Sequence, residues 1–176
     1  MIESSILQSF KDKRILITGG TGLIGRQVVS ILCDAGARVT IASLDDIRVH
    51  PAAEHVFGDL TDLSLCKEIT SDKDCVFHIA GIKGSVEVTR SRPASFFVPL
   101  LMMNTNILEA CRLNKVSKVL YTSSIGAYAA GEVFKEDDGA EGEPMDMFPG
   151  WAKRMAEMQV QAYRTQYGLD NFAVVR

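Results

Sequence analysis

A glycine-rich segment near the N-terminus constrains the fold of this chain more than any other stretch. Residues 14–18 form a short apolar run typical of a buried strand, and residues 22–35 have the apolar spacing of a helix that ends near Gly36. Between the two lies the run Thr18 to Gly25, with glycines at positions 19, 20, 22 and 25. A strand that leads into closely spaced glycines and then into a helix is the pattern of a phosphate-binding turn. The segment therefore predicts the first β–turn–α unit of a dinucleotide-binding domain.

Three of these glycines have separate expected roles. Gly19 permits the tight turn, Gly22 lets the backbone approach a pyrophosphate, and Gly25 lets the helix pack closely on the strand. The first backbone N–H groups of the helix, at Leu23 and Ile24, then face the phosphates with a partial positive charge. The alternative is a glycine-rich strand-to-helix turn that holds no ligand.

Strand and helix patterns alternate along the rest of the chain. Strands are expected at 38–42, 55–59, 74–79, 118–122 and 171–175, and helices at 61–69, 93–113 and 149–167. Pro99 predicts a break or kink in the first turns of the second of these helices. Short, nearly continuous apolar strands separated by helices indicate a parallel sheet covered on both faces. The predicted fold class is α/β, a Rossmann-type doubly wound parallel sheet in a single domain over residues 1–176.

Composition narrows the function classes. The 176 residues are 47% hydrophobic and 23% charged with a net charge of −3, so no basic surface for nucleic acid is expected. The N-terminus lacks the features of a signal peptide and no apolar run approaches a membrane span, which favours a cytoplasmic protein without a membrane partner. Residues 132–146 are rich in carboxylates and predict a solvated loop. The four cysteines have no CxxC spacing and are expected to be buried thiols, with no metal site: Cys33, Cys66, Cys75 and Cys111.

The glycine turn has GxxGxxG spacing, and five further segments follow it in the order typical of one superfamily. Together they resemble the extended branch of the short-chain dehydrogenase/reductase superfamily, which includes nucleotide-sugar epimerases, dehydratases and reductases. The resemblance covers nearly the whole chain. The five segments are residues 58–62 (GDLTD), 77–83 (FHIAGIK), 106–111 (NILEAC), 121–128 (YTSSIGAY) and 150–153 (GWAK).

The resemblance implies a cofactor site for NAD or NADP. Asp59, with Leu60 beside it, is expected at the adenine. The strand end at Ala80 and Gly81 is expected to pack against the cofactor, and Lys83 can reach it.

Ser43 stands 18 residues after the third glycine, where NAD-selective members carry an Asp for the ribose hydroxyls. Loss of that carboxylate makes NADP admissible, whereas Asp45 and Asp46 follow closely and can repel a 2′-phosphate. The cofactor choice therefore stays open. Leu100 replaces an Asn of the family, which is expected to loosen a cofactor contact.

The resemblance also implies catalytic residues. In the family a Tyr hydroxyl is the acid/base, a Lys four residues later lowers the pKa of that Tyr, and a Ser or Thr binds the substrate oxygen. Ser124, with Ser123 as its neighbour, and Lys153 take the Ser and Lys roles, although a turn serine and a solvent-facing lysine are the alternatives. Pro149 stands at the tyrosine position, so the usual proton relay is expected to be lost. Tyr128 is the nearest substitute phenol.

In the family a C-terminal substrate domain follows the sixth strand, and the sequence stops at Arg176 before any such domain. A truncated gene, a fragment and a piece of a split protein are equally open. The first functional hypothesis is an NAD(P)-dependent epimerase, dehydratase or reductase acting on a nucleotide-diphosphate sugar in polysaccharide biosynthesis, or its N-terminal portion. The second is a cofactor-binding protein without catalysis, and the third is a defective remnant. A homodimer through the helices at 93–113 and 149–167 is expected by resemblance.

Overall fold

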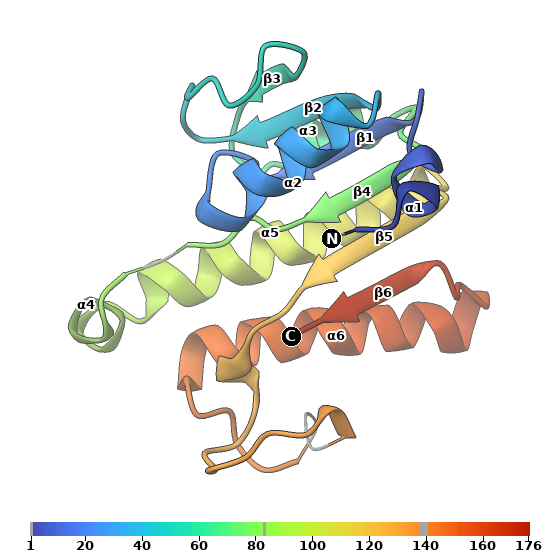
Figure 1. Cartoon of the computed structure of the whole chain (residues 1–176). Coiled ribbons are helices and arrows are strands. Elements are labelled where there is room, and N and C mark those ends of the chain that lie inside the picture. The colour runs from blue at the N-terminus through green and yellow to red at the C-terminus, as the bar shows by residue number, and fades with distance from the viewer. Residues whose placement is uncertain (1, 83, 138–140) are drawn as a thin grey trace.

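The computed structural model describes residues 2–82, 84–137 and 141–176. In this part of the chain a single sheet of six parallel strands has the order β3-β2-β1-β4-β5-β6 (Figure 1). The predicted α/β fold class is confirmed. The strands are β1 (Arg14–Thr18), β2 (Arg38–Ser43), β3 (Glu54–Phe57), β4 (Cys75–His78), β5 (Lys118–Thr122) and β6 (Phe172–Val175).

The helices divide between the two faces of the sheet. On one face α2 packs against β1 and β2, and on the other α3, α5 and α6 pack side by side. Right-handed crossovers require this division, because the chain moves one way across the sheet from β1 to β3 and the other way afterwards. The longer helices are α2 (Leu23–Asp34), α3 (Leu63–Thr70), α5 (Ala94–Leu113) and α6 (Met147–Tyr167). The short ones are α1 (Ser4–Gln8), α4 (Val86–Ser91) and the 3₁₀ turn η1 (Ile125–Ala127).

Successive residues along the strands pack alternately into two separate hydrophobic cores, one on each face of the sheet. Along β1, Ile15 and Ile17 pack toward α2, whereas Leu16 packs toward α3 and α5. All three are fully buried. The carboxyl ends of β1 and β4 lie together where the strand order reverses. Open α/β sheets generally bind their ligands at such an edge.

The structure corrects one of the two expectations for Pro99, a break in the helix. The residue lies in the second turn of α5, and the helix continues unbroken to Leu113. A proline in the second turn removes only one backbone hydrogen bond near the helix start, and packing of α5 against α3 and α6 holds the rest. The helices α1 and α4 were not expected from the sequence. All four cysteines are buried free thiols, as predicted.

Among the described residues, α5 has the length and apolar composition that a membrane-spanning helix needs. In the fold its apolar side chains have another role. Leu100, Met103, Ile107 and Leu108 are buried in the core between the sheet and the neighbouring helices. Packing within the domain therefore accounts for the composition of α5.

Candidate functional site

The glycine turn lies where β1 and β4 end. Gly19 has a φ of +67°, and a Cβ atom on it would lie 2.7 Å from the Cα of Ala80 on the neighbouring segment. A Cβ on Gly25 would lie 2.2 Å from the carbonyl oxygen of Gly19. Both positions thus exclude side chains on steric grounds. A Cβ on Gly22 would meet only the Gly19 oxygen, at 3.3 Å, so this glycine borders open space.

The N-terminus of α2 opens from this turn. Gly22 is the N-cap, and within the described residues no side chain caps the helix. Leu23 and Ile24 are 83% and 54% exposed, so the first turn of the helix faces solvent. Uncapped N–H groups and the helix dipole make such a terminus an anion-binding site. Next to it, the Arg26 guanidinium donates to the carbonyl oxygen of Thr21 (Nη2···O 2.9 Å).

The end of β2 adjoins the glycine turn through a hydrogen bond. The Thr21 hydroxyl donates to Oδ2 of Asp45 (3.0 Å). Ser43 lies two residues earlier and is buried, with its Oγ 2.7 Å from the Asp45 carbonyl oxygen and 2.6 Å from Nε2 of His55. The predicted ribose position therefore lies beside the turn, but its hydroxyl is engaged within the protein.

The predicted adenine segment follows β3. Asp59 is exposed, and its Oδ1 accepts from the backbone N–H of Thr61 (2.9 Å). Leu60 is buried in the core. The Asn106 side chain on α5 donates to the carbonyl oxygens of Leu60 (3.2 Å) and Thr61 (2.9 Å), and so fixes this segment against α5. Whether Asp59 and Leu60 contact a cofactor stays a prediction.

The segment after β4 lies next to the glycine turn. Ala80 lies directly against Gly19, and its backbone N–H points to the Thr18 hydroxyl (3.3 Å). Gly81 is exposed beside it. Lys83, also predicted at the cofactor, lies outside the described residues.

Ser124 and Lys153 each have a polar contact near the carboxyl end of β5. The Ser124 Oγ accepts from the backbone N–H of Gly126 (3.1 Å) where η1 begins. The Lys153 ammonium donates to the carbonyl oxygen of Thr122 (2.7 Å), two residues before Ser124. Pro149 lies in the first turn of α6, a position that accepts proline because its N–H is not needed there. The two predicted residues therefore both lie near the carboxyl end of β5, with Pro149 one helical turn before the lysine.

Tyr128 is buried at the same end of the sheet. Its ring lies 5.2 Å from the Arg176 guanidinium carbon and 5.4 Å from the ring of Phe134. Packing on these two side chains accounts for its burial. Leu100 is likewise a core residue, 2% exposed.

A buried polar chain behind the site was not predicted from the sequence. Nδ1 of His78 accepts from the Thr18 hydroxyl (2.7 Å), since that oxygen already accepts two backbone N–H groups. Nε2–H of His78 donates to Oδ1 of Asn104 (3.0 Å), whose amide nitrogen reaches the Tyr121 hydroxyl (3.2 Å). Burial, together with the Lys153 charge, lowers the pKa of His78 to about 3. The signal available was Asn104 itself, a polar residue in an otherwise apolar stripe of α5.

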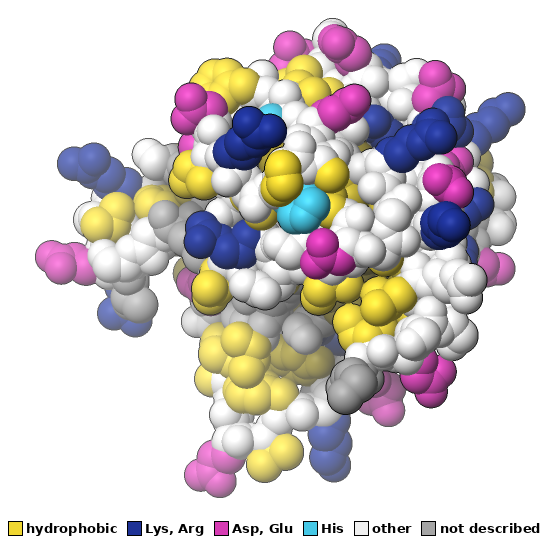
Figure 2. Space-filling model, turned by 45° about the horizontal axis from the view of Figure 1, so that its top comes forward, with side chains coloured by type: hydrophobic (Ala, Val, Ile, Leu, Met, Phe, Trp, Pro, Cys, Tyr) yellow, Lys and Arg dark blue, Asp and Glu magenta, His cyan; other side chains and the backbone are white. Residues whose placement is uncertain are grey.

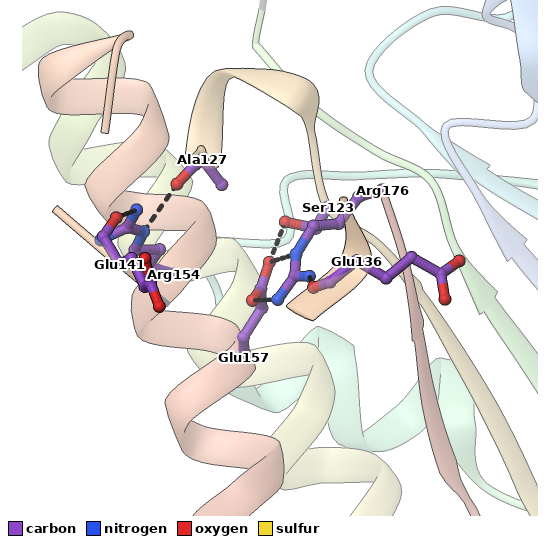
Figure 3. A network of polar contacts seen from close by, with 7 residues as sticks. All are labelled: Ser123, Ala127, Glu136, Glu141, Arg154, Glu157 and Arg176. Atoms are coloured by element: carbon purple, nitrogen blue, oxygen red, sulfur yellow. Dashed lines mark hydrogen bonds and ion pairs between the residues drawn. The ribbon is translucent and has the colours of Figure 1, made fainter. Parts of the chain in front are cut away.

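A second network of polar contacts, drawn in Figure 3, joins α6 to the ends of β5 and β6. Both carboxylate oxygens of Glu157 accept from the Arg176 guanidinium, at 3.1 and 2.6 Å, and the Ser123 hydroxyl also donates to Glu157. Arg176 further donates to the carbonyl oxygen of Glu136 (3.0 Å). Glu157 lies one helical turn after Lys153, so this network fixes that part of α6 against the ends of β5 and β6.

Arg154 fixes the long connection between β5 and α6. The side chain is buried, and its guanidinium donates to the carbonyl oxygens of Ala127 (2.6 Å), Glu141 (2.8 Å) and Gly142 (2.5 Å). Figure 3 shows it on the face of α6 toward η1. Residues 132–146, called the acidic loop below, are thus fixed to α6 by a buried cation at Glu141 and Gly142. Composition alone does not predict this contact.

A parallel sheet of this order, with a glycine turn and an uncapped helix N-terminus at the reversal point, defines a Rossmann-type α/β domain. The sequence model of the NAD dependent epimerase/dehydratase family matches residues 15–176. The chain belongs to this family.

The similar proteins are much longer than the region that matches this chain. A UDP-glucose 4-epimerase from Azospirillum brasilense is 28% identical over 172 residues, covering 92% of this chain and 48% of that protein. A 3 beta-hydroxysteroid dehydrogenase/Delta 5-->4-isomerase from Mycobacterium tuberculosis is 32% identical over 126 residues, covering 68% and 34%. The structure of UDP-glucose 4-epimerase from Thermus thermophilus in complex with NAD has a TM-score of 0.76 and 27% identity, covering 93% and 54%. The chain spans about half the length of these relatives, or less.

Proposed function

We propose that this chain binds NAD at its glycine turn, as the cofactor-binding part of a nucleotide-sugar epimerase or dehydratase. The observation that carries the proposal is the uncapped N-terminus of α2 at the switch point, with Gly22 open toward solvent. Leu23, Ile24 and Gly25 would supply backbone N–H groups to the pyrophosphate. The NAD complex of the Thermus thermophilus relative supports this choice of cofactor.

The proposal assigns Lys153 to the nicotinamide ribose and Ser124 to a substrate oxygen. A bound nicotinamide would accept or return the hydride, and catalysis would further need a group that moves the substrate proton. Pro149 has no ionisable group, so the chain lacks a phenol one turn before Lys153. We therefore propose that the chain holds the cofactor but does not run the usual proton relay.

Cofactor binding is tested by titrating the protein with NADH, followed by fluorescence and by the melting temperature. Gly22→Val is expected to abolish the NADH-induced shift, because the new side chain occupies the space before the α2 N-terminus. The matched control is Gly131→Val, since a Cβ there meets nothing closer than 3.8 Å. Absence of an NADH response in the wild-type protein at millimolar concentration contradicts the proposal.

The relay is tested by Pro149→Tyr, with Pro149→Phe as the matched control. Both variants restore an aromatic ring, and only the first restores an ionisable hydroxyl. If the missing phenol is the limiting defect, Pro149→Tyr but not Pro149→Phe will catalyse the reduction of NAD by a substrate. The panel would hold nucleotide sugars and, given the Mycobacterium tuberculosis relative, a 3β-hydroxysteroid. If neither variant is active, the limiting defect lies outside the proton relay.

We also propose a homodimer through the outer faces of α5 and α6. Val98 and Met102 on α5 are 48% and 45% exposed, and Met155 on α6 is 46% exposed, so adjacent helices carry apolar surface. Sedimentation velocity should give the mass of two chains for the wild type and of one chain for Met102→Glu. Val133→Glu, at an exposed apolar residue of the acidic loop, is the control.

A further inference from the structure

We infer that Asn104, a buried residue of α5, is a positioning residue for the Lys153 ammonium. This inference rests on the proposed contact between Lys153 and the nicotinamide ribose. It concerns a residue outside the five segments that resemble the family, because Asn104 lies two residues before the segment 106–111. Hydrogen bonds join Asn104 to both elements next to the lysine, β5 and α6.

The side-chain amide of Asn104 has two N–H donors, and it reaches an acceptor on each of two elements. Nδ2 lies 3.2 Å from the Tyr121 hydroxyl oxygen on β5. The same nitrogen lies 3.5 Å from the carbonyl oxygen of Ala152 on α6, the residue directly before Lys153. Asn104 is 1% exposed, so it makes these contacts inside the core. One side chain of α5 therefore ties the Tyr121 ring to the α6 backbone.

Both groups that Asn104 contacts bear on the Lys153 side chain. The Ala152 carbonyl belongs to the peptide unit that carries the backbone nitrogen of Lys153, so its position affects where the side chain begins. The centre of the Tyr121 ring lies 5.0 Å from the ammonium nitrogen, a distance at which an aromatic ring attracts a cation. The ammonium also donates to the carbonyl oxygen of Thr122 (2.7 Å), next to Tyr121 on β5. Asn104 thus acts on both ends of the lysine side chain.

The orientation of the Asn104 amide is set from the strand that leads into the glycine turn. The Thr18 hydroxyl accepts two backbone N–H groups, so its own proton goes to Nδ1 of His78 (2.7 Å). His78 then carries its proton on Nε2 and donates to Oδ1 of Asn104 (3.0 Å). With its oxygen turned toward His78, the amide must turn its NH₂ group toward Tyr121 and Ala152. Hydrogen bonds of one fixed direction therefore lead from β1 to the surroundings of the lysine.

A purely structural role for Asn104 predicts a different outcome from a positioning role. If Asn104 only satisfies buried polar groups, its loss lowers stability and leaves the affinity of the folded protein for NADH unchanged. If Asn104 positions Lys153, its loss weakens NADH binding, and does so only while Lys153 is present. A double-mutant cycle on the dissociation constant of NADH separates the two roles.

The experiment measures NADH dissociation constants for the 176-residue chain and for Asn104→Leu, Lys153→Met and the double variant. Leu has a similar branched shape to Asn and no donor. We expect Lys153→Met to weaken NADH binding about tenfold and Asn104→Leu about three- to tenfold. The double variant should bind no more weakly than Lys153→Met, because no ammonium is left to position. Tyr121→Phe keeps the ring and removes only the hydroxyl, and should weaken binding about two- to threefold while Lys153 is present.

Thr70→Val is the control for lost stability. Thr70 is fully buried and donates to the carbonyl oxygen of Cys66 (2.7 Å) at the end of α3, so the variant removes a buried hydrogen bond in another helix. It should lower the midpoint of urea unfolding and leave the NADH dissociation constant within about twofold of the wild-type value.

Arg48→Gln is the control for lost positive charge. Arg48 lines a hollow of about 360 Å³ together with His50 and His55, between the β2–β3 connection and β3. Figure 2 views the molecule from this side, where an exposed histidine lies among basic, acidic and hydrophobic side chains. NADH is an anion, so loss of a surface cation can weaken its binding. Because Arg48 lies on this connection and Asn104 in the core of α5, the effects of the two variants should add.

A wild-type dissociation constant in folded Asn104→Leu, or an equal loss with and without Lys153, overturns the positioning role. If Asn104→Leu fails to fold, Tyr121→Phe gives the same test, and unchanged NADH binding in that variant overturns the role as well. Unchanged NADH binding in Lys153→Met overturns this inference and the ribose assignment, and leaves the glycine turn as the proposed cofactor site. If the wild-type protein binds no NADH, this inference and the proposed function fail together.

Discussion

Nε2 of His78 lies 3.0 Å from the side-chain oxygen of Asn104, and both residues are almost completely buried. The pair joins β4 to α5. The Thr18 hydroxyl extends this hydrogen-bond network to β1, which leads into the glycine turn. At the other end, Asn104 bonds to Tyr121, and the centre of the Tyr121 ring lies 5.0 Å from the Lys153 ammonium nitrogen. The two halves of the candidate site are therefore connected by groups that must stay neutral.

The buried imidazole predicts a loss of stability in mild acid. Desolvation lowers the pKa of His78 from 6.5 to about 3 in the folded protein, so as the pH falls below 6.5 only the unfolded chain takes up the proton. The contribution is fully present above pH 6.5 and is lost progressively toward pH 3. Between pH 7 and pH 5 the free energy of unfolding should fall by about 2 kcal/mol from this group. Urea unfolding at the two pH values measures it.

The control for this prediction is His50→Gln, at a histidine on the connection between β2 and β3, which should retain the His78 contribution. Nitrogen chemical shifts give a second measurement. His78 should show the neutral Nε2–H tautomer at pH 5, since Nδ1 accepts from Thr18. A charged His78 at pH 5 in the folded state would contradict the assignment.

The glycines of the turn should separate into structural and ligand-facing positions. Gly25→Ala places a Cβ 2.2 Å from the Gly19 carbonyl, which requires the backbone to move and should cost about 1–3 kcal/mol or more of stability. Gly22→Ala meets that oxygen only at 3.3 Å and should change stability by less than about 1 kcal/mol. Urea unfolding of the two variants compares them directly. Equal losses would show that Gly22 is also required by packing.

Much of the fold was predictable because local patterns and packing agree. The apolar strand 14–18, the glycine turn and the amphipathic α2 each indicate the same β–α unit, and the observed bounds differ by a residue or two. The expected helix break at Pro99 is wrong, because the effect of a proline depends on where it falls in the helix and on packing against neighbours. The short helices α1 and α4 have too few turns to give a periodic signal.

The backbone positions of the candidate site could be predicted from the sequence, whereas most contacts of its side chains could not. Gly19, Gly22 and Gly25 follow from the constraints on a turn, which are local. Hydrogen bonds such as Thr21 to Asp45 join residues 24 positions apart, and Glu157 to Arg176 joins two elements. Such contacts depend on how the elements are placed in space, which single-sequence patterns do not specify.

The buried guanidinium of Arg154 should control the order of the acidic loop. Arg154→Met leaves three carbonyl oxygens without their donor, and hydrogen bonds from a charged group are worth about 1.5–3 kcal/mol each, so a loss above about 3 kcal/mol is expected. Arg154→Lys should be intermediate. The matched control on the same helix is Arg164→Met, since the Arg164–Asp170 pair is exposed (58% and 84%) and should change stability by less than about 1 kcal/mol. Cleavage by a glutamate-specific protease within residues 132–146 should accelerate in Arg154→Met alone.

The Glu157–Arg176 pair should show energetic coupling that an exposed pair lacks. Its side chains are 13% and 23% exposed, and both guanidinium contacts reach the same carboxylate, a geometry that strengthens the hydrogen bonds. A double-mutant cycle of Glu157→Gln and Arg176→Gln should give a coupling of about 1–3 kcal/mol, against less than about 0.5 kcal/mol for Arg164 and Asp170. Glu157→Gln alone should cost more than the coupling itself, because it leaves a half-buried guanidinium without its counter-charge. Raising the salt concentration should weaken the exposed pair and leave the Glu157 coupling largely unchanged, and equal coupling in the two pairs would contradict the role assigned to this network.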